Sequence, residues 1–329
     1  MESNSAQSTV KSRHTGVILS AGKGSRIDPF NTRYPKPMLP IVNRPILEHQ
    51  VEQMKSVGIR EIVIVVGHLQ ELIREHFGDG SRFGVAIRYV EQKHALGIAH
   101  AAMQLERHVS GPFLLFLGDI FYVAKDLQAM VRTFESGGVN GVLAVKRESD
   151  PAAIQKNFAV TIDDHLNVSK VVEKPRYLVN NLKGCGMYMF GPEIFDALRQ
   201  TPRTAMRDEY ELTTAIQIFI DSGYRVKACE VVDWDYNITF PVDLLDCNAR
   251  FLRHSGAKNA ISSSARIHAG ATLEGAVIGD DVVIDNPIRV INSILLPGTH
   301  IVDREDVVDS VVLKELRIHC PLTAKDPVS

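Results

Sequence analysis

The sequence predicts an α/β protein with a doubly wound, mixed but mostly parallel sheet, followed by a short C-terminal left-handed parallel β-helix. Three observations lead to this fold class. Apolar runs at 16–19, 62–66 and 113–117 are continuous rather than alternating, which is typical of central strands covered on both faces. Segments with helical spacing lie between and after these runs. Near the C-terminus, an apolar residue recurs every six positions.

The first helix is predicted between the first two strands. Leu47, Val51, Met54 and Val57 lie three or four residues apart, and Gly58 ends the pattern. A second helix is expected directly after Gly97. Strands that alternate with helices imply right-handed crossovers and a largely parallel sheet. We therefore expect ligands at the carboxyl ends of the strands.

The C-terminal tail follows a polar break at 252–256. Three groups of three apolar residues, each restarting 17 positions after the last, give the repeat: Ile261, Ile267 and Leu273, then Ile278, Ile284 and Val290, then Leu295, Ile301 and Val307. This spacing favours a triangular β-helix with one inward residue on each flat face. A few ordinary strands with coincidental spacing are the alternative. We expect a disordered lead-in over 1–13, a catalytic domain over 14–254 and the repeat tail over 255–329.

Composition narrows the classes of function. The formal net charge is -2, so no basic field would recruit nucleic acid. The four cysteines lie far apart in the sequence, which argues against a disulfide framework and a cysteine zinc site. No apolar run approaches the roughly 20 residues that span a bilayer. The polar first dozen residues do not resemble a signal peptide. We expect a cytoplasmic protein that binds neither membranes nor nucleic acid.

A glycine-rich stretch, Ser20–Arg26, follows the first predicted strand. Glycines allow backbone N–H groups to approach a phosphate closely, and the Arg26 guanidinium adds a charged fork. The pattern is not a Walker loop, and an unliganded tight turn would be the ordinary interpretation of these residues alone. The continuation, Tyr34–Pro40, surrounds Lys36 with prolines. This lysine is therefore expected to be held in a fixed position near the glycine-rich stretch.

These two stretches resemble the sugar-1-phosphate nucleotidylyltransferases, or NDP-sugar pyrophosphorylases, which carry Gly-x-Gly-Ser/Thr-Arg followed by Pro-Lys-Pro. Further matches follow in order over about 14–250: Gln92-x-x-x-x-Gly97-Ile98-Ala99-His100-Ala101, Leu117-Gly118-Asp119, Glu173-Lys174-Pro175 and Gly186-Met187-Tyr188-Met189-Phe190. With its repeat tail, the chain looks most like the long-form glucose-1-phosphate thymidylyltransferases. The resemblance implies a Rossmann-like nucleotidyltransferase fold.

The resemblance also implies a role for each matching residue. Arg26 and Lys36 would neutralise a triphosphate. Lys174 would hold the phosphate of the incoming sugar, and Glu173 would accept hydrogen bonds from sugar hydroxyls. Asp119 would bind Mg²⁺, a hard cation suited to carboxylate and phosphate oxygens. The remaining contacts implied are Leu19, Ala21, Gly22, Gly24, Ser25, Gln92 and Gly97 for the nucleotide, and Ala159 and Gly186 for the sugar phosphate.

The implied reaction is an in-line attack of a sugar-phosphate oxygen on the α-phosphorus of the triphosphate, with release of pyrophosphate. The phosphate is already ionised near neutral pH, so no general base is required, and positioning and charge neutralisation supply most of the rate. Structural roles remain open for four of the candidates. Asp119 could cap the next element, Glu173 and Lys174 could form a surface ion pair, and Gln92 could satisfy backbone groups. His68, His94 and His100 show no ligand spacing and are interpreted as non-catalytic.

Two departures from the family pattern matter. The second metal ligand usually lies in a Trp-x-Asp segment, whereas this chain has Trp234-Asp235-Tyr236-Asn237. We favour Asn237 as the ligand, with Asp235 in reserve, because tyrosine binds Mg²⁺ poorly. Ala159 stands where relatives commonly have a glycine that faces the sugar, which leaves the identity of the sugar open.

Gln92 favours a pyrimidine, so we expect dTTP or UTP as nucleotide. The resemblance to glucose-1-phosphate thymidylyltransferases implies glucose 1-phosphate as sugar. A mannose-1-phosphate guanylyltransferase, or a regulatory or structural subunit of the same fold without turnover, is the alternative. An acyltransferase role for the tail is disfavoured by its few coils. The tail is instead expected to mediate homo-oligomerisation, as a dimer or tetramer, or to carry a regulatory site.

Overall fold

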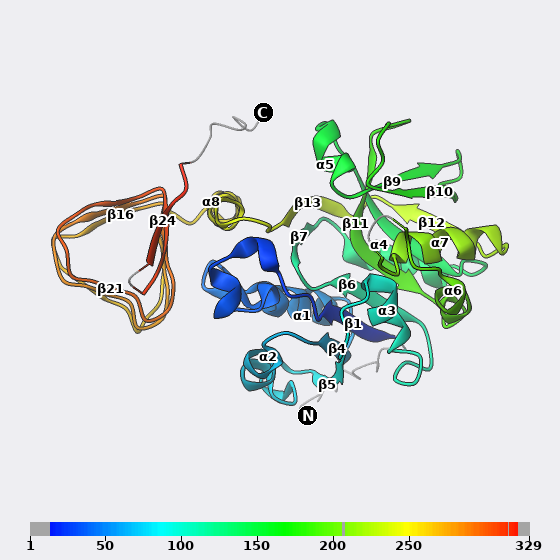
Figure 1. The fold of residues 1–329 in the computed structure, drawn as a ribbon, viewed down its shortest axis with the longest axis horizontal. Helices are drawn as coiled ribbons and strands as arrows, with labels where there is room; N and C mark the ends of the chain where they lie inside the picture. Colours follow the sequence, from blue (N-terminus) through cyan, green and yellow to red (C-terminus); the bar gives the residue numbers. More distant parts are fainter. Residues whose placement is uncertain (1–13, 206–207, 315, 322–329) are drawn as a thin grey trace, which may run out of the picture. The chain divides into compact units, whose positions relative to one another are not determined.

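The computed structural model describes residues 14–205, 208–314 and 316–321 (Figure 1). The chain forms two compact units. Unit 1 consists of the residues up to Gly22, Gln50–Gly118 and Tyr122–Asp235, and unit 2 of Lys23–His49, Asp119–Phe121 and the residues from Tyr236 onward. The expected lead-in, 1–13, lies outside the described residues. The expected domain boundary at 254 stays a prediction.

Unit 1 is built on a nine-stranded sheet with the order β10-β9-β11-β6-β1-β4-β5, in which β8 pairs with both β11 and β12. Its strands are β1 (Thr15–Ser20), β4 (Glu61–Val66), β5 (Ala86–Glu91), β6 (Phe113–Leu117), β8 (Gly141–Arg147), β9 (Phe158–Ile162), β10 (Val168–Glu173), β11 (Leu182–Phe190) and β12 (Val226–Cys229). Strands β6, β1, β4 and β5 are parallel, whereas β11 runs antiparallel to β6, β8 and β9. The mixed α/β sheet predicted from the sequence is thus confirmed.

Helices connect and cover these strands. Their bounds are α1 (Ile46–Ser56), α2 (Gln70–Phe77), α3 (Ile98–Met103), α4 (Leu127–Glu135), α5 (Pro151–Gln155), α6 (Ile194–Gln200) and α7 (Leu212–Asp221). The side chains of Asp126 and Asp150 cap α4 and α5 by accepting hydrogen bonds from backbone N–H groups of their first turns. Helix α1 ends one residue before Val57, the last residue of the predicted pattern. Among the described residues, no helix is long and apolar enough to cross a membrane.

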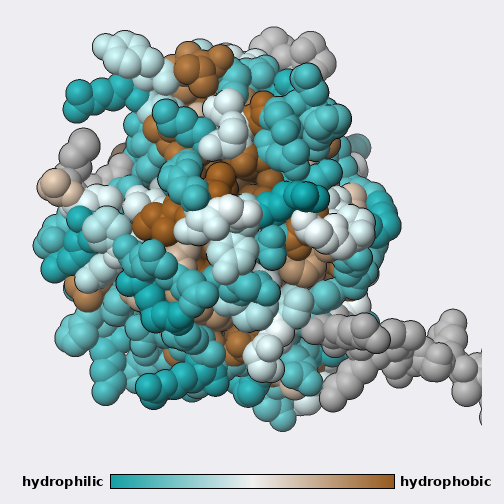
Figure 2. Space-filling view, turned by 90° about the vertical axis from the view of Figure 1, so that its right-hand side faces the viewer, coloured by the Kyte–Doolittle hydropathy of each residue, from teal (hydrophilic) through white to brown (hydrophobic). Residues whose placement is uncertain are grey.

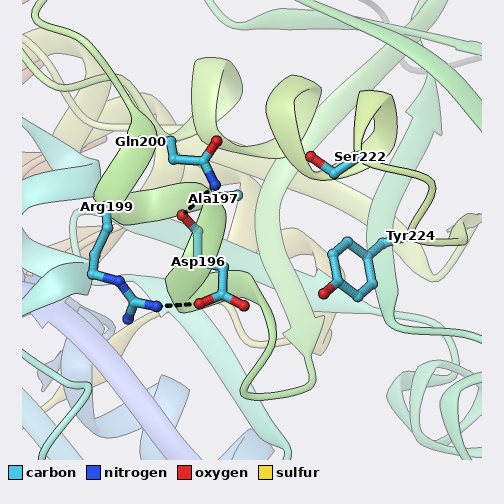
Figure 3. Close-up of a pocket in the computed structure, with 6 residues that line it drawn as sticks. All are labelled: Asp196, Ala197, Arg199, Gln200, Ser222 and Tyr224. Atoms are coloured by element: carbon cyan, nitrogen blue, oxygen red, sulfur yellow. Dashed lines mark hydrogen bonds and ion pairs between the residues drawn. The ribbon is translucent and has the colours of Figure 1, made fainter.

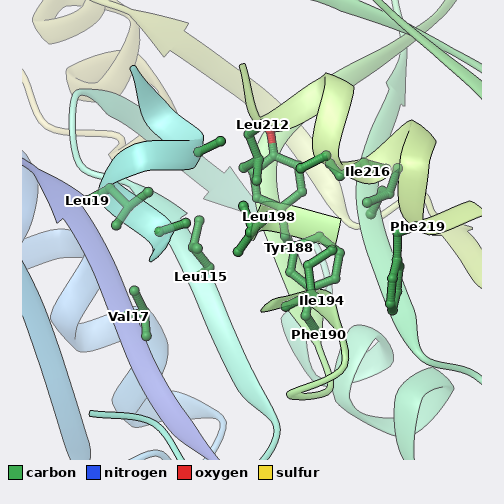
Figure 4. Close-up of a cluster of buried hydrophobic side chains, with 14 of the residues drawn as sticks. Val17, Leu19, Leu115, Tyr188, Phe190, Ile194, Leu198, Leu212, Ile216 and Phe219 are labelled. Atoms are coloured by element: carbon green, nitrogen blue, oxygen red, sulfur yellow. The ribbon is translucent and has the colours of Figure 1, made fainter. Parts of the chain in front are cut away.

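The core of unit 1 explains why the three apolar runs are continuous. Val17 and Leu19 of β1 and Leu115 of β6 face side chains from β11, α6 and α7, which include Tyr188, Phe190, Ile194, Leu198, Leu212, Ile216 and Phe219 (Figure 4). The alternate residue Ile18 is also fully buried. Burial on both faces of β1 requires apolar residues at successive positions.

On the outer face shown in Figure 2, hydrophilic side chains predominate and hydrophobic ones gather near the middle.

Strand β1 marks the point where the strand order reverses. Its neighbours are β4 on one side and β6 on the other, and all three are parallel. Connections that leave a strand in opposite directions open a crevice at its carboxyl end, where α/β proteins bind ligands. The glycine-rich stretch begins at the end of β1, and Asp119 lies two residues after β6. The short β7 (Ile120–Ala124) follows and pairs with β13 (Val232–Asn237).

The tail in unit 2 is the predicted parallel β-helix. Its parallel strands are β14 (Ala260–Ile261), β15 (Arg266–Ile267), β16 (Thr272–Glu274), β17 (Val277–Ile278), β18 (Val283–Ile284), β19 (Arg289–Ile291), β20 (Ile294–Leu295), β21 (His300–Ile301), β22 (Val307–Val308) and β23 (Ser310–Leu313). The last strand, β24 (Leu316–His319), pairs antiparallel with β23. Equivalent strands pair in parallel with an offset of 17 residues, as Ile261, Ile278 and Leu295 show. The inner residues of the middle coil, Ile278, Ile284 and Val290, are at most 2% exposed. Ile261, in the first coil, is 50% exposed.

A hairpin and a helix fix the tail within unit 2. The hairpin consists of β2 (Pro40–Ile41) and β3 (Arg44–Pro45). At its tip, the Asn43 amide donates to the carbonyl of Ile278 in the β-helix (2.7 Å). Asn248 of α8 (Pro241–Ser255) accepts from the backbone N–H of Val42 (2.7 Å) and donates to the carbonyl of Pro40 (3.1 Å). The hairpin therefore joins the segment after Lys36 to both α8 and the β-helix.

His49 gives unit 2 a pH-dependent stability. Its ring packs edge-on against Phe121 and Phe251, and its Nε2 lies 3.0 Å from the carbonyl oxygen of Ile41. Burial lowers the pKa of His49 below its ordinary 6.5, which outweighs the opposing effect of the Ile41 hydrogen bond. The unfolded chain thus takes up this proton more readily than the folded chain. The stabilisation is complete above about pH 6.5 and is lost as pH falls through the folded-state pKa.

We predict that His49→Gln, which keeps an N–H donor for Ile41, makes the free energy of unfolding less dependent on pH below 6.5 than in the wild type. Urea unfolding at several pH values measures this difference, with His319→Gln, an exposed histidine of the same unit, as control. Equal pH dependence in the wild type and His49→Gln would contradict the prediction.

Candidate active site

The glycine-rich stretch turns sharply after β1. Gly24 has φ 60°, and a Cβ at this position would lie 3.3 Å from the Cβ of Lys36. Both the backbone conformation and the close approach therefore favour glycine. A single turn of 3₁₀ helix, η1 (Ser25–Ile27), follows and carries Arg26 with an exposed side chain. Leu19 and Ala21 at the end of β1 are buried.

Lys36 is the central cation of the site. It begins the 3₁₀ turn η3 (Lys36–Met38), and the neighbouring prolines restrict the backbone on both sides. Its residue exposure is only 6%, so the ammonium needs partners. Nζ donates to Oδ2 of Asp119 and to Oδ1 of Asn237, each at 2.9 Å. Residues from three distant segments of the sequence thus meet at one positive charge.

The charges of Lys36 and Arg26 stabilise the ionised form of Asp119. Partial burial by itself would raise the pKa of the Asp119 carboxyl, but the charge and hydrogen bond of Lys36 and the charge of Arg26 hold it below its ordinary value. Asp119 is therefore ionised at neutral pH. Its side chain is 45% exposed, so the carboxylate that binds Lys36 remains accessible from solvent.

The oxygens of Asp119 and Asn237 also suit a hard divalent cation. Both point at the same positive centre, and carboxylate and amide oxygens are ligands that Mg²⁺ accepts. In the described part of the chain, no group of three or more His, Cys, Asp or Glu side chains could hold a metal ion. A metal at this point would therefore need further oxygens from a bound phosphate or water, as is usual for Mg²⁺.

Asp235, the reserve metal ligand, belongs to a different cluster. Its carboxylate accepts from Nζ of Lys183 on β11 at 2.7 and 2.8 Å, and both side chains are at most 5% exposed. Burial alone would lower the pKa of Lys183, but the charge of Asp235, assisted by Glu148, raises it. The hydroxyl of Tyr236 donates to Asp246. Asn237 is thus the residue of this segment whose oxygen meets the Lys36 ammonium.

Sequence analysis did not identify the Lys183–Asp235 pair. The available signal was weak, namely one lysine in the apolar and small-residue strand Leu182–Phe190. Lys183 lies opposite Ala159 in the pairing of β11 with β9 and opposite Lys146 in the pairing with β8. The buried ion pair is therefore next to the segment expected to meet the sugar.

The expected base-reading residues lie together in unit 1. Gln92 directly follows β5, is 8% exposed, and its Nε2 is 2.9 Å from Nδ1 of His100. The amide therefore contacts another side chain, contrary to the alternative in which it satisfies only backbone groups. Gly97 has φ 110°, and a Cβ there would lie 2.5 Å from the carbonyl oxygen of Tyr210. Glycine at position 97 therefore leaves room for the backbone of Tyr210, which a Cβ would overlap.

The expected sugar-phosphate residues lie on or directly after the paired strands β9, β10 and β11. Glu173 ends β10, lies opposite Phe158, and accepts from the Thr213 hydroxyl (3.3 Å). Lys174 has φ 43°, an unusual value for a lysine, and its N–H donates to Asn157. Ala159 is the next residue after Phe158 on β9.

Gly186 lies at an irregularity of β11. It has φ 72°, and its carbonyl accepts from the hydroxyl of Tyr122 (3.0 Å). Glu173 and Gly186 thus fall at a strand end and at an irregular strand position, whereas Ala159 lies inside the regularly paired β9.

One polar depression of unit 1 contains none of these residues. It has a volume of about 330 Å³ and is lined by Asp196, Ala197, Arg199, Gln200, Ser222 and Tyr224 (Figure 3). The guanidinium of Arg199 pairs there with Asp196 and also with Glu106. These pairs satisfy the arginine within the protein, so the depression offers no unpaired cation.

Comparison with known proteins agrees with the fold and the motifs. The family model described as nucleotidyl transferase matches residues 15–236. The low-salt glycan biosynthesis nucleotidyltransferase of Haloferax volcanii is 35% identical over 84% of this chain and 73% of its own length. A UTP–glucose-1-phosphate uridylyltransferase of the same organism is 34% identical over 69% of this chain and 92% of its own length. The glucose-1-phosphate thymidylyltransferase of Streptomyces griseus is 29% identical over 90% and 84%.

Solved structures share the fold. A structure of UDP-glucose pyrophosphorylase with UDP-glucose covers 73% of this chain and 99% of its own, with a TM-score of 0.66 and 21% identity. A putative glucose-1-phosphate thymidylyltransferase from Bacillus anthracis covers 72% and 94%, with a TM-score of 0.65 and 25% identity.

We predict that Lys183→Met destabilises the protein by about 3–5 kcal/mol, because it leaves the buried Asp235 carboxylate without a counter-charge. The double variant Lys183→Met with Asp235→Leu should recover most of this loss, since neither buried charge remains. Denaturant unfolding measures both, and Lys170→Met, an exposed lysine on β10, should stay within about 0.5 kcal/mol of the wild type. A double variant as unstable as the single one would exclude the uncompensated charge as the cause.

Proposed function

Because the chain belongs to the nucleotidyl transferase family, we propose that it transfers a nucleoside monophosphate from a nucleoside triphosphate to a sugar 1-phosphate, with release of pyrophosphate and formation of an NDP-sugar. The observation that carries the proposal is the convergence of Lys36, Asp119 and Asn237. A cation held between two oxygen ligands near a glycine-rich turn is suited to polyphosphate chemistry. The named activities of the relatives support the same reaction class.

The residues of the chain act mainly by position and charge. The exposed guanidinium of Arg26 binds triphosphate oxygens, and Lys36 offsets the negative charge that develops at the α-phosphorus. Lys174 holds the sugar phosphate, and Glu173 accepts from sugar hydroxyls. The attacking phosphate oxygen is already ionised, so no residue has to remove a proton from it.

Asp119 and Asn237 would hold Mg²⁺, which neutralises phosphate charge when bound. The ammonium of Lys36 lies between their two oxygens in the structure and marks where positive charge is stabilised. An amide in place of a second carboxylate lowers the negative charge of the site, so a bound metal would depend strongly on the phosphates of the substrate.

We propose UTP or dTTP as nucleotide and glucose 1-phosphate as sugar. Gln92 supports a pyrimidine, because its amide both donates and accepts at a base edge. The relatives named uridylyltransferase and thymidylyltransferase support glucose 1-phosphate. An inactive regulatory or structural subunit is less well supported, because Arg26, Lys36, Asp119 and Lys174 are all present. A cytoplasmic location and a homo-oligomer, dimer or tetramer, stay predictions.

A pyrophosphate-release screen tests the proposal. It crosses UTP, dTTP, CTP, GTP and ATP with glucose, N-acetylglucosamine and mannose 1-phosphates, each with and without Mg²⁺. Turnover that requires both substrates and the metal is the expected result. No turnover with any pair would overturn the proposal in favour of a subunit without catalysis.

We predict that Asp119→Ala lowers kcat/KM by at least about 10²-fold, because it removes the anionic partner of Lys36 and a metal ligand. Asn237→Ala should raise the Mg²⁺ concentration needed for half-maximal rate, and Asn237→Asp should lower it, since a carboxylate binds the cation more strongly. Mg²⁺ titration of the initial rate measures all three. Asn286→Ala in the β-helix is the control and should leave the rate unchanged.

Undiminished activity in Asp119→Ala would refute the metal role of this residue. Unchanged Mg²⁺ dependence in Asn237→Ala would refute Asn237 as the second ligand.

A further inference from the structure

The orientation of the Gln92 side-chain amide is set by His100. The two side chains come from the end of β5 and from α3, and Nε2 of Gln92 lies 2.9 Å from Nδ1 of His100. An amide nitrogen only donates, so Nδ1 must accept, and a neutral ring must carry its proton on Nε2. Within the described part of the chain, the carbonyl oxygen Oε1 of Gln92 accepts no hydrogen bond. The oxygen Oε1 is thus an acceptor that a bound base could use.

The surroundings of His100 hold the ring in this role. The ring stacks on Tyr210, with centroids 6.1 Å apart and planes inclined by 29°. Tyr210 is itself fixed at both ends of its backbone, since its N–H donates to Leu96 and its carbonyl accepts from Ala99. The amide nitrogen of Gln104 donates to the carbonyl oxygen of His100 (3.4 Å) and lies 3.5 Å from the other ring nitrogen, Nε2. Because an amide nitrogen and a protonated Nε2 are both donors, this longer contact does not hold the ring, and the 2.9 Å contact with Gln92 decides which nitrogen accepts.

The nearby charges favour the neutral ring. Burial lowers the pKa of His100 below its ordinary value, and the neighbouring His94 lowers it further. On the side of Tyr210, the guanidinium of Arg203 lies 5.9 Å from the phenol ring centroid, but it is paired with the carboxylate of Asp208 (2.7 Å), so this face adds little net charge. A neutral His100 at physiological pH keeps Nδ1 available as an acceptor.

We infer that His100 is a positioning residue that fixes the Gln92 amide with Oε1 toward the base and thereby selects uracil or thymine over cytosine. The inference rests on the proposed function, in which Gln92 meets the base. Uracil and thymine present an N3–H donor, which suits Oε1, whereas N3 of cytosine is an acceptor and would face another acceptor. Selectivity among the pyrimidines then follows from a residue that does not touch the base.

The same contact makes the selectivity depend on pH. A protonated His100 carries hydrogens on both ring nitrogens and cannot accept from Gln92. The amide then gains by turning over, with Oε1 toward the ring and the amino group outward, which suits N3 of cytosine. The preference for UTP over CTP should therefore fall as pH drops through the pKa of His100, below its ordinary 6.5.

The test compares kcat/KM for UTP and for CTP across pH in the wild type and two variants. His100→Leu removes the acceptor and should reduce the UTP-to-CTP ratio about 10-fold or more. His100→Asn places an amide oxygen where Nδ1 lies, so it should retain most of the ratio and lose its pH dependence. His94→Asn, the matched histidine control, should retain both the ratio and a pH-dependent change in it. Equal losses for UTP and CTP in His100→Leu, or an unchanged ratio, would overturn the inference.

Two further measurements separate this inference from the proposed function. In a Gln92→Ala background, His100→Leu should not change the ratio again, whereas an additional change would refute action through Gln92. Histidine nitrogen NMR of the protein without substrate should show His100 as the Nε2–H tautomer at neutral pH, and an Nδ1–H tautomer would overturn the inference regardless of activity. Absence of turnover in the wild type with any triphosphate would instead defeat the proposed function.

Discussion

The site depends on one interaction, the ammonium of Lys36 held between the carboxylate of Asp119 and the amide oxygen of Asn237. A nearly buried cation is costly without partners, so these contacts constrain all three segments at once. The prolines on either side of Lys36 reduce the conformations available to its backbone, and Asp119 follows the central strand β6. The contact that stabilises unit 2 is therefore also the one on which the proposed phosphate chemistry depends.

The β-helix contributes to this constraint through the β2–β3 hairpin. The hairpin begins four residues after Lys36, and its backbone and tip are held by Asn248 of α8 and by the β-helix through Asn43. Each asparagine bonds to backbone groups, which fix position more strictly than contacts between flexible side chains. The tail is therefore a structural support for the segment that carries Lys36, in addition to any part in oligomerisation.

Much of the fold could be predicted because its signals are local. The continuous run at 113–117 and the six-residue spacing of Ile278, Ile284 and Val290 follow from burial along one short segment. The Lys183–Asp235 pair and the Gln92–His100 contact could not be predicted in this way. Their members are separated by 52 and 8 residues, and each contact depends on how side chains from different elements approach one another. His100 in particular carries no metal-ligand spacing, and only its ring contact with Gln92 gives it a role.

The charged and the neutral parts of the site respond differently to pH. Lys36 and Arg26 lower the pKa of Asp119, so acidification toward pH 6 leaves the charge cluster unaltered. Burial lowers the pKa of His100 from an ordinary value of 6.5, against an ordinary 3.8 for Asp119, and protonation of the ring would reverse the hydrogen-bonding pattern that Gln92 offers. A decrease in pH should therefore alter which base is chosen before it weakens the electrostatics of phosphate transfer. This order follows because the carboxylate is stabilised by adjacent cations, whereas the imidazole has no carboxylate beside it among the contacts that hold its ring.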